Sequence, residues 1–369
     1  MAPIGEDQLI MVRVAHISDS HLGCSLFQLV ERREDSRRCL KKAVDMAMRY
    51  SPDILVHTGD LFDSPFPSWD DANFTLELFR DLQDKVHAIV LQGNHDLPYG
   101  YRRAQSPVLA LENAGFITST GTKTYSHATS DFDGETVNLH LISWTRPREL
   151  MRTVSSIPSS DDTTLLFAHD IPSPREEVPA HFDYVGFGHS HNFWLDEDLG
   201  MGRPGSTCIV DWRREQGGNK KLIIIDVSST GNEYQTETLN DVREFKYIIG
   251  LNITGMGVEE AEESMRNRLD SLSPKKTKPI VIMEVAGIID SETESSINRI
   301  EILKYGEKAL KPLFFHIEPR WNTLGPRRVN LSEPLNVEKS ISDYITQTNA
   351  GNAEEMIGCL QRLVEEGSA

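Results

Sequence analysis

This 369-residue chain has few cysteines, no long apolar run and few basic residues, and each of these features argues against a class of protein. It has only four cysteines, widely spaced and without a C-x-x-C pair, which argues against a disulfide framework and against a cysteine zinc site. No apolar run approaches the roughly 20 residues that a membrane span needs, and the first residues lack a basic segment followed by an apolar one. We therefore expect a soluble, cytoplasmic protein with reduced thiols and no membrane partner.

Basic residues are also scarce, since 38 Lys and Arg stand against 56 Asp and Glu, with a formal net charge of −18. Binding to a nucleic-acid backbone usually requires a basic surface, so the overall charge argues against such a partner. Local charge differs, because Arg and Lys crowd residues 32–42 and recur at Arg102 and Arg103. The first cluster could meet phosphates or form the solvated face of a helix, and the second interpretation is favoured.

Size and composition indicate a folded protein of more than one part. Hydrophobic residues make up 38% and charged residues 25%, as in ordinary globular proteins, and the chain exceeds one typical core. We predict a main domain over 1–237 and a smaller α+β domain without a chemical motif over 238–331. A tail over 332–369 carries the apolar spacing of two short amphipathic helices.

Short apolar runs alternate with amphipathic segments from residue 12, which is typical of an α/β layer fold. The spacing predicts strands at 12–18, 53–59 and 87–93, with helices over 34–49 and 70–83 between them. Further strands are predicted at 138–144, 163–169 and 182–189, followed by a strand pair at 208–210 and 221–227.

Five short elements with metal-binding side chains follow these strands in order. They are D-S-H at 19–21, G-D at 59–60, G-N-H-D at 93–96, a lone histidine at 169, and G-H-S-H at 188–191. Their oxygen and imidazole donors suit Mn²⁺, Fe²⁺ or Zn²⁺, and alternation directs both ligands of D-S-H and H-S-H to one side. The predicted metal ligands are Asp19, His21, Asp60, Asn94, His169, His189 and His191.

Seven donors exceed the ligand set of one tetrahedral ion and suit two ions about 3.5–4 Å apart that share a carboxylate, here Asp60. Any one element alone is more readily a turn, a helix cap or a hydrogen-bonded histidine. Their joint occurrence at strand ends favours the metal site. Asp96 could orient His95 or cap the next turn. Seven histidines are interpreted as structural: His16, His57, His87, His127, His140, His181 and His316.

These elements resemble the calcineurin-like metallophosphoesterase superfamily. Longer segments resemble the DNA double-strand-break repair nucleases of the meiotic-recombination-eleven or SbcD family, namely VAHISDSHLG, HTGDLFDSPFPS, GNHDLP, FDYVGFGHSH and RPGST. The resemblance spans roughly residues 12–230. It implies a layered β-sandwich flanked by helices, then a capping domain, then a helical tail that docks on a partner.

The resemblance also implies roles for individual residues. One ion would be bound by Asp19, His21, Asp60 and His191. The other would be bound by Asp60, Asn94, His169 and His189. His95 matches the catalytic histidine that assists the leaving group without binding metal.

Family members are manganese-dependent, dimeric 3′-to-5′ exonucleases and endonucleases that act with an ABC-type ATPase carrying long coiled coils. The resemblance therefore implies DNA as substrate, two Mn²⁺ ions, and association with the nucleoid if the source is a prokaryote. Asp63 departs from the many members with a histidine at this position, which leaves the balance of exonuclease and endonuclease activity open. Two alternatives remain: a phosphodiesterase for nucleotides or other small molecules, and a catalytically silent repair scaffold.

Overall fold

A computed structural model describes residues 11–99, 105–132, 134–215, 219–228, 230–240, 242–272, 278–323 and 356–357. The chain divides into two compact units, Met1–Arg243 and Glu244–Ala369, which are described separately. Arg102 and Arg103 lie outside the described residues, as does the predicted tail apart from residues 356 and 357. No helix within the described ranges is long and apolar enough to cross a membrane.

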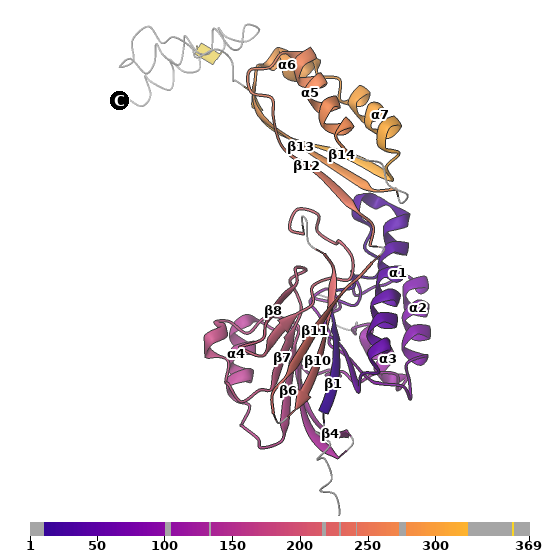
Figure 1. Ribbon diagram of the computed structural model, residues 1–369, viewed down its shortest axis with the longest axis vertical. Coiled ribbons are helices and arrows are strands. Elements are labelled where there is room, and N and C mark those ends of the chain that lie inside the picture. The colour runs from indigo at the N-terminus through magenta and orange to yellow at the C-terminus, as the bar shows by residue number, and fades with distance from the viewer. Residues whose placement is uncertain are drawn as a thin grey trace, which may run out of the picture. The chain divides into compact units, whose positions relative to one another are not determined.

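The first unit contains a five-stranded sheet covered by helices on one face (Figure 1). Its strands β1, β2 and β3 run parallel, and β10 is antiparallel to β1 and β11. The strand order is β11 (Glu233–Thr238), β10 (Lys221–Ser228), β1 (Met11–Ile17), β2 (Ile54–His57) and β3 (His87–Val90). The helices are α1 (Val30–Ala47), α2 (Trp69–Arg80) and α3 (Val108–Asn113).

A six-stranded sheet forms the second β layer of this unit. Strands β5, β6, β7 and β9 are parallel, while β4 and β8 pair antiparallel at the two edges. The order is β4 (Tyr125–Phe132), β5 (Glu135–Ile142), β6 (Thr163–Ala168), β7 (Tyr184–Phe187), β9 (Met201–Arg203) and β8 (Trp194–Asp196). Helix α4 (Pro147–Ser155) follows β5, and 3-10 turns occupy Leu26–Gln28, Met48–Tyr50 and Arg175–Glu177.

Alternation along the buried strands explains why the layers stack. In β1, Val12 and Val14 enter the core between the two sheets, whereas Ala15 and Ile17 enter the core beneath the helices. A strand buried on both faces needs apolar residues at successive positions, which is what these runs supply. The predicted layered α/β fold flanked by helices is confirmed.

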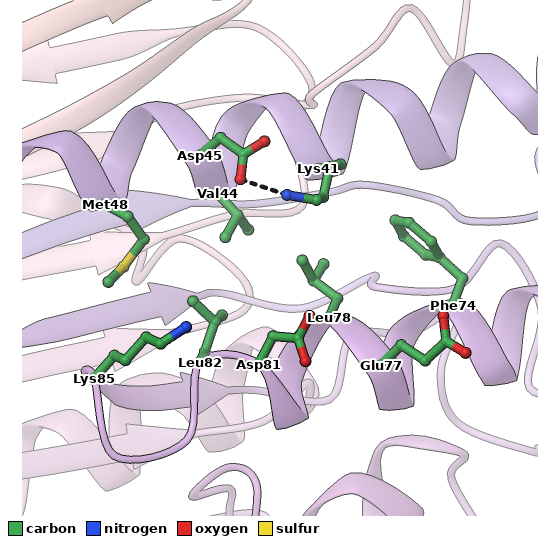
Figure 2. Close-up of a pocket in the computed structure, with 10 residues that line it drawn as sticks. All are labelled: Lys41, Val44, Asp45, Met48, Phe74, Glu77, Leu78, Asp81, Leu82 and Lys85. Carbon is green, nitrogen blue, oxygen red and sulfur yellow. Dashed lines mark hydrogen bonds and ion pairs between the residues drawn. The ribbon is translucent and has the colours of Figure 1, made fainter.

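Helices α1 and α2 pack side by side and leave a groove of about 360 Å³ between them. Figure 2 shows the side chain of Val44 in α1 directed toward Leu78 of α2 and toward Leu82, which follows the end of α2. At the rim, Lys41 Nζ lies 2.5 Å from Asp45 Oδ1, one turn further along α1. None of the predicted metal ligands lines this groove.

Half of the basic residues in the α1 cluster are exposed, as the favoured interpretation of a solvated face predicts, whereas one arginine is internal. Arg32 is 1% exposed and donates hydrogen bonds to Asp35 and to the carbonyl of Ile209. Arg37 pairs with Asp71 at 2.6 Å. A buried guanidinium needs carboxylate and carbonyl acceptors, and the fold provides them for Arg32.

One predicted strand is absent from the structure. Residues 208–210 form no strand, because the carboxylate of Glu215 binds the backbone N–H of Val210 and Arg32 binds the carbonyl of Ile209, which occupies the groups a strand would pair. Strand β11 ends at Thr238, and the first compact unit ends at Arg243.

The second unit is a three-stranded parallel sheet with helices on one face (Figure 1). Its strands are β12 (Phe245–Asn252), β13 (Ile280–Ile289) and β14 (Phe314–Thr323), in that order. Its helices are α5 (Val258–Asp270), α6 (Ser291–Ser296) and α7 (Arg299–Leu310). Among its described residues no His, Cys, Asp or Glu belongs to a potential metal cluster.

Candidate metal centre

The structure brings all seven predicted ligands together where parallel strands of the two sheets end. The segments after β1, β2 and β3 carry Asp19, His21, Asp60 and Asn94, and those after β6 and β7 carry His169, His189 and His191. Carboxyl ends of parallel strands are the usual location of chemistry in α/β proteins. Two sheets therefore contribute to one site.

The backbone at this site is strained so that side chains can converge. Asp19, His21, Asp60 and His189 adopt positive φ values of 49°, 43°, 51° and 66°. Such left-handed conformations are uncommon for residues with a side chain and cluster at functional sites. Gly93 allows the close approach, because a Cβ there would lie 2.1 Å from Asp60 Oδ1.

On one side of the site, His21 and His191 turn imidazole nitrogens toward each other, with their Nε2 atoms 3.1 Å apart. His21 Nδ1 lies 3.1 Å from Asp63 Oδ1, and His191 Nδ1 lies 2.8 Å from Glu215 Oε1. Ionised carboxylates only accept hydrogen bonds, so each Nδ1 carries the hydrogen and each Nε2 of the neutral ring presents a lone pair.

Asp19 adds a carboxylate oxygen to this side. Its Oδ1 accepts the backbone N–H of His189 at 3.1 Å, while Oδ2 is buried and has no hydrogen-bond partner among the described residues. A buried charged oxygen without a partner is costly unless a cation neutralises it. Together with the two facing lone pairs, it forms a donor set that fits a divalent ion.

The other side is built around the amide oxygen of Asn94. His169 Nε2 lies 3.1 Å from Asn94 Oδ1, and His189 Nδ1 lies 2.9 Å from the same atom. The carbonyl of Thr58 accepts from His169 Nδ1 at 2.8 Å, so Nε2 is the ring nitrogen that faces Asn94 Oδ1. This second group of acceptors also fits a cation.

Asp60 lies between the two sides. Its Oδ2 is 3.7 Å from His21 Nε2 and 3.4 Å from His169 Nε2, while its Oδ1 accepts the backbone N–H of His95 at 2.8 Å. Burial lowers the pKa of His169, but the Asp60 carboxylate outweighs it and raises that pKa to about 9. The metal-free site thus attracts a proton where a cation would bind.

His95 lies at the rim of a cavity of about 390 Å³ that opens over these residues. Its Nδ1 is 3.0 Å from the carbonyl oxygen of Asp63, and its ring centroid is 4.7 Å from that of His21. His95 also lies close enough to His21 and Asp60 for the three side chains to bind one metal ion together. The cavity lining continues through Ser190, Asn192, Val210, Asp211 and Arg214.

Asp96 does not contact the His95 ring, contrary to one of its two expected roles. The buried carboxylate accepts backbone N–H groups of Leu61, Phe62 and Gly93 at 3.2, 2.9 and 2.9 Å. Burial and the nearby charge of Asp60 raise its pKa, to about 7. It therefore ties the turn that carries Asp60 to the turn that carries Asn94.

Two of the histidines interpreted as structural are buried and hydrogen-bonded next to the site. His16 contacts Tyr184 and Thr58 through its two ring nitrogens. His57 contacts the hydroxyl of Ser20 and accepts the backbone N–H of Gly59. Burial lowers the pKa of both rings to about 3, so both are neutral supports of the strand ends.

Glu215 and Lys220 are the site residues that the motifs did not reveal. Glu215 is 24 positions from His191 in sequence, in a loop without a predicted element, yet it contacts the His191 ring. Asp63 stands where many family members have a histidine, and that pattern does not predict its contact with His21. Only an RPGST segment nearby could have drawn attention to the loop.

Comparison with known proteins assigns the class first. The profile of the family described as "Calcineurin-like phosphoesterase" matches residues 12–193, the range that holds every predicted ligand. The chain is therefore a phosphoesterase of the calcineurin-like class, a hydrolase by class, with the fold and donor set described above.

Curated relatives narrow the class. Three are named "DNA double-strand break repair protein Mre11". The relative from Thermoplasma acidophilum is 29% identical, covering 75% of this chain and 78% of its own. Those from Methanopyrus kandleri and Methanococcus maripaludis are 25% and 22% identical and cover 70% and 79% of this chain and 62% and 83% of their own. These similarities support the resemblance to the Mre11 and SbcD family that the sequence motifs indicate.

Proposed function

We propose that this protein is a two-metal DNA nuclease. Asp19, His21, Asp60 and His191 would hold one divalent ion. Asp60, Asn94, His169 and His189 would hold the other. The observation that carries the proposal is the convergence of imidazole nitrogens, carboxylate oxygens and an amide oxygen on one place, such as the Nε2 atoms of His21 and His191 at 3.1 Å.

Two divalent ions bound there, which we propose to be Mn²⁺, would supply positive charge to polarise a phosphoryl group and to acidify an attacking water. The chain itself contributes positioning and proton transfer. His95 donates Nδ1–H to the Asp63 carbonyl, so Nε2 is the nitrogen left to hold a proton at the cavity. Delivery of that proton to the leaving sugar oxygen is a general-acid role.

DNA as the substrate rests on the relatives' printed names and on the family, whose members act as 3′-to-5′ exonucleases and endonucleases. Arg214 supports a polyanion, because it lines the cavity with a side chain that is 86% exposed. The test is Mn²⁺-dependent cleavage of DNA with defined ends, beside cyclic nucleotides and bis-p-nitrophenyl phosphate. Hydrolysis of the small esters with intact DNA would favour a small-molecule phosphodiesterase; metal loading without any hydrolysis would favour a scaffold.

A homodimer is the second part of the proposal. Trp69 at the start of α2 is 83% exposed and Phe66 is 54% exposed, beside an apolar pocket that also includes Leu76 and Leu111. Apolar patches of this kind commonly mark protein interfaces. A second copy would cover this surface, so Trp69→Glu should yield monomers by light scattering. Ile300→Glu, at an exposed apolar position of α7, is the matched control.

We also propose an ABC-type ATPase with a coiled coil as partner, which would bind the last segment of the chain. The residues of that segment, including Leu360 and Leu363, lie outside the described ranges, so the proposal rests on the family and on apolar spacing. Replacing both leucines with Asp should abolish co-purification of such an ATPase. Undiminished co-purification would count against this docking site. A role in repair implies association with DNA in the cell.

A further inference from the structure

The loop between β9 and β10 delivers a buried carboxylate to the metal centre. Glu215 is 1% exposed, and both of its oxygens are fully used. Oε1 accepts His191 Nδ1–H at 2.8 Å and the backbone N–H of Val210 at 3.0 Å. Oε2 accepts the Ser206 hydroxyl at 2.9 Å and the ammonium of Lys220. A carboxylate so deeply buried is costly unless it is paired and hydrogen-bonded, and here it is both.

Lys220 connects the same pair to the backbone of His191. Its ammonium is buried and donates to the His191 carbonyl at 3.1 Å and to Ser206 Oγ at 2.8 Å, besides the ion pair with Glu215. The ion pair therefore contacts both the ring and the main chain of His191. An ion pair that only stabilised the fold would not need to contact His191, whose ring lies close to Asp19 and His21.

We propose that Glu215 is a positioning residue: it fixes His191 in the Nδ1–H tautomer and aims Nε2 at the ion that Asp19, His21 and Asp60 would share. This inference rests on the proposed function for the presence of that ion. Carboxylates behind a ligating histidine orient the ring and raise its basicity, and their loss typically weakens metal binding by about 10- to 100-fold.

Burial distinguishes Glu215 from the other acceptors behind the histidines. Asp63, which accepts from His21, has a side chain that is 36% exposed and is partly screened by solvent. His169 rests on the neutral carbonyl of Thr58. Glu215 is the one acceptor among these three that is both charged and buried, so its removal should have the greatest effect on its ion.

Two double variants separate the acceptor from the ion pair. Glu215→Gln with Lys220→Met keeps an oxygen for His191 Nδ1–H and for Val210 N–H while it removes both charges. Glu215→Leu with Lys220→Met removes the charges and the acceptor. Mn²⁺ titration followed by electron paramagnetic resonance should give two ions for wild type and the Gln variant, with affinities within several-fold. The Leu variant should bind one ion about 10- to 100-fold more weakly.

A double-mutant cycle tests whether Glu215 acts through His191. In a His191→Ala background, exchanging the Gln variant for the Leu variant should cause no further loss of Mn²⁺ affinity, because the ring to be positioned is absent. Asp226→Asn, which removes a partly buried ion pair with Arg13 far from the ligands, controls for loss of stability and should bind Mn²⁺ like wild type.

Equal Mn²⁺ affinity of the Gln and Leu variants would overturn the inference, and so would an undiminished effect in the His191→Ala background. Wild-type protein that binds no Mn²⁺ would overturn it together with the metal site. Wild-type protein that binds two ions but leaves DNA intact would reject the nuclease proposal alone, because the affinity difference between the two variants would still be measured.

Discussion

The two sides of the candidate metal centre are built differently. On the Asp19 side, a carboxylate joins two imidazoles, His21 and His191, and both rings are backed by carboxylates. On the Asn94 side, the matching position holds a neutral amide, and His169 is backed by a carbonyl. Because cation affinity rises with the negative charge of its ligands and of the groups behind them, the Asp19 side should hold its ion more tightly.

This difference in expected affinity suggests that the two ions have different roles within one site. A tightly held ion keeps its ligands in place between turnovers, whereas a weakly held ion can exchange with the solution. Asp60 touches both groups, so it should couple the two ions. The following changes test this comparison, from the largest expected effect to the smallest.

Replacing the shared carboxylate should weaken both sides of the site at once. Asp60→Asn takes a charge from both sides and should lower DNA cleavage by at least about 10³-fold, since loss of one preorganised electrostatic partner alone costs about 10²- to 10³-fold. Mn²⁺ titration should then show that both ions bind more weakly. If only one affinity changed, Asp60 would belong to one side and would not be the bridge.

His95→Asn should separate catalysis from metal binding. The side chain contacts the Asp63 carbonyl and lines the cavity, so its loss should leave Mn²⁺ binding near the wild-type value and slow DNA cleavage by about 10²- to 10⁴-fold. A p-nitrophenyl ester is the internal control, because its leaving group needs no proton and should be affected less. Loss of one bound Mn²⁺ would make His95 a ligand and reject the general-acid role.

Asn94→Asp should make the two sides more alike. The substitution keeps an oxygen at the position that His169 and His189 face and adds one negative charge. We expect the weaker Mn²⁺ affinity to rise by roughly 10- to 100-fold while the tighter one stays the same. Calorimetric titration of the metal-free protein with Mn²⁺ would show whether the two affinities converge. Two unchanged affinities would mean that ligand charge does not set the difference between the two sides.

A change of pH should act on the Asn94 side through His169. Burial lowers the pKa of His169, but Asp60 raises it to about 9, above the ordinary value of 6.5. The proton on His169 therefore stabilises the metal-free fold fully below about pH 6.5, and that contribution disappears as pH rises through about 9. Mn²⁺ must displace the proton, so the weaker affinity should increase about tenfold from pH 7 to pH 8.

Melting curves of EDTA-treated protein, and calorimetry in buffers of different ionisation enthalpy, would measure these two effects. His169→Asn should remove both. Proton release that persisted in that variant would assign the proton to another group.

Several residues show how far sequence reasoning reached. The strands before Asp19, Asp60, Asn94 and His169 were predictable, because buried runs of branched residues bounded by Gly and polar residues have few other structures open to them. Residues 208–210 were predicted wrongly, since their apolar character resembles a strand while their backbone groups are bound by the side chains of Glu215 and Arg32. Strand propensity depends on neighbouring residues, so it does not predict a hydrogen bond from a side chain that is distant in the sequence.

By itself, the sequence determined the layered α/β fold, the identity and order of the seven donors, and the family. These follow from periodicity and short motifs, which act over neighbouring residues. Only the tertiary structure decided that Arg32 is internal, that Asp96 ties two turns together, and that Glu215 with Lys220 holds His191. Those contacts join residues far apart in the chain, and which of many carboxylates meets a given ring depends on how the layers pack.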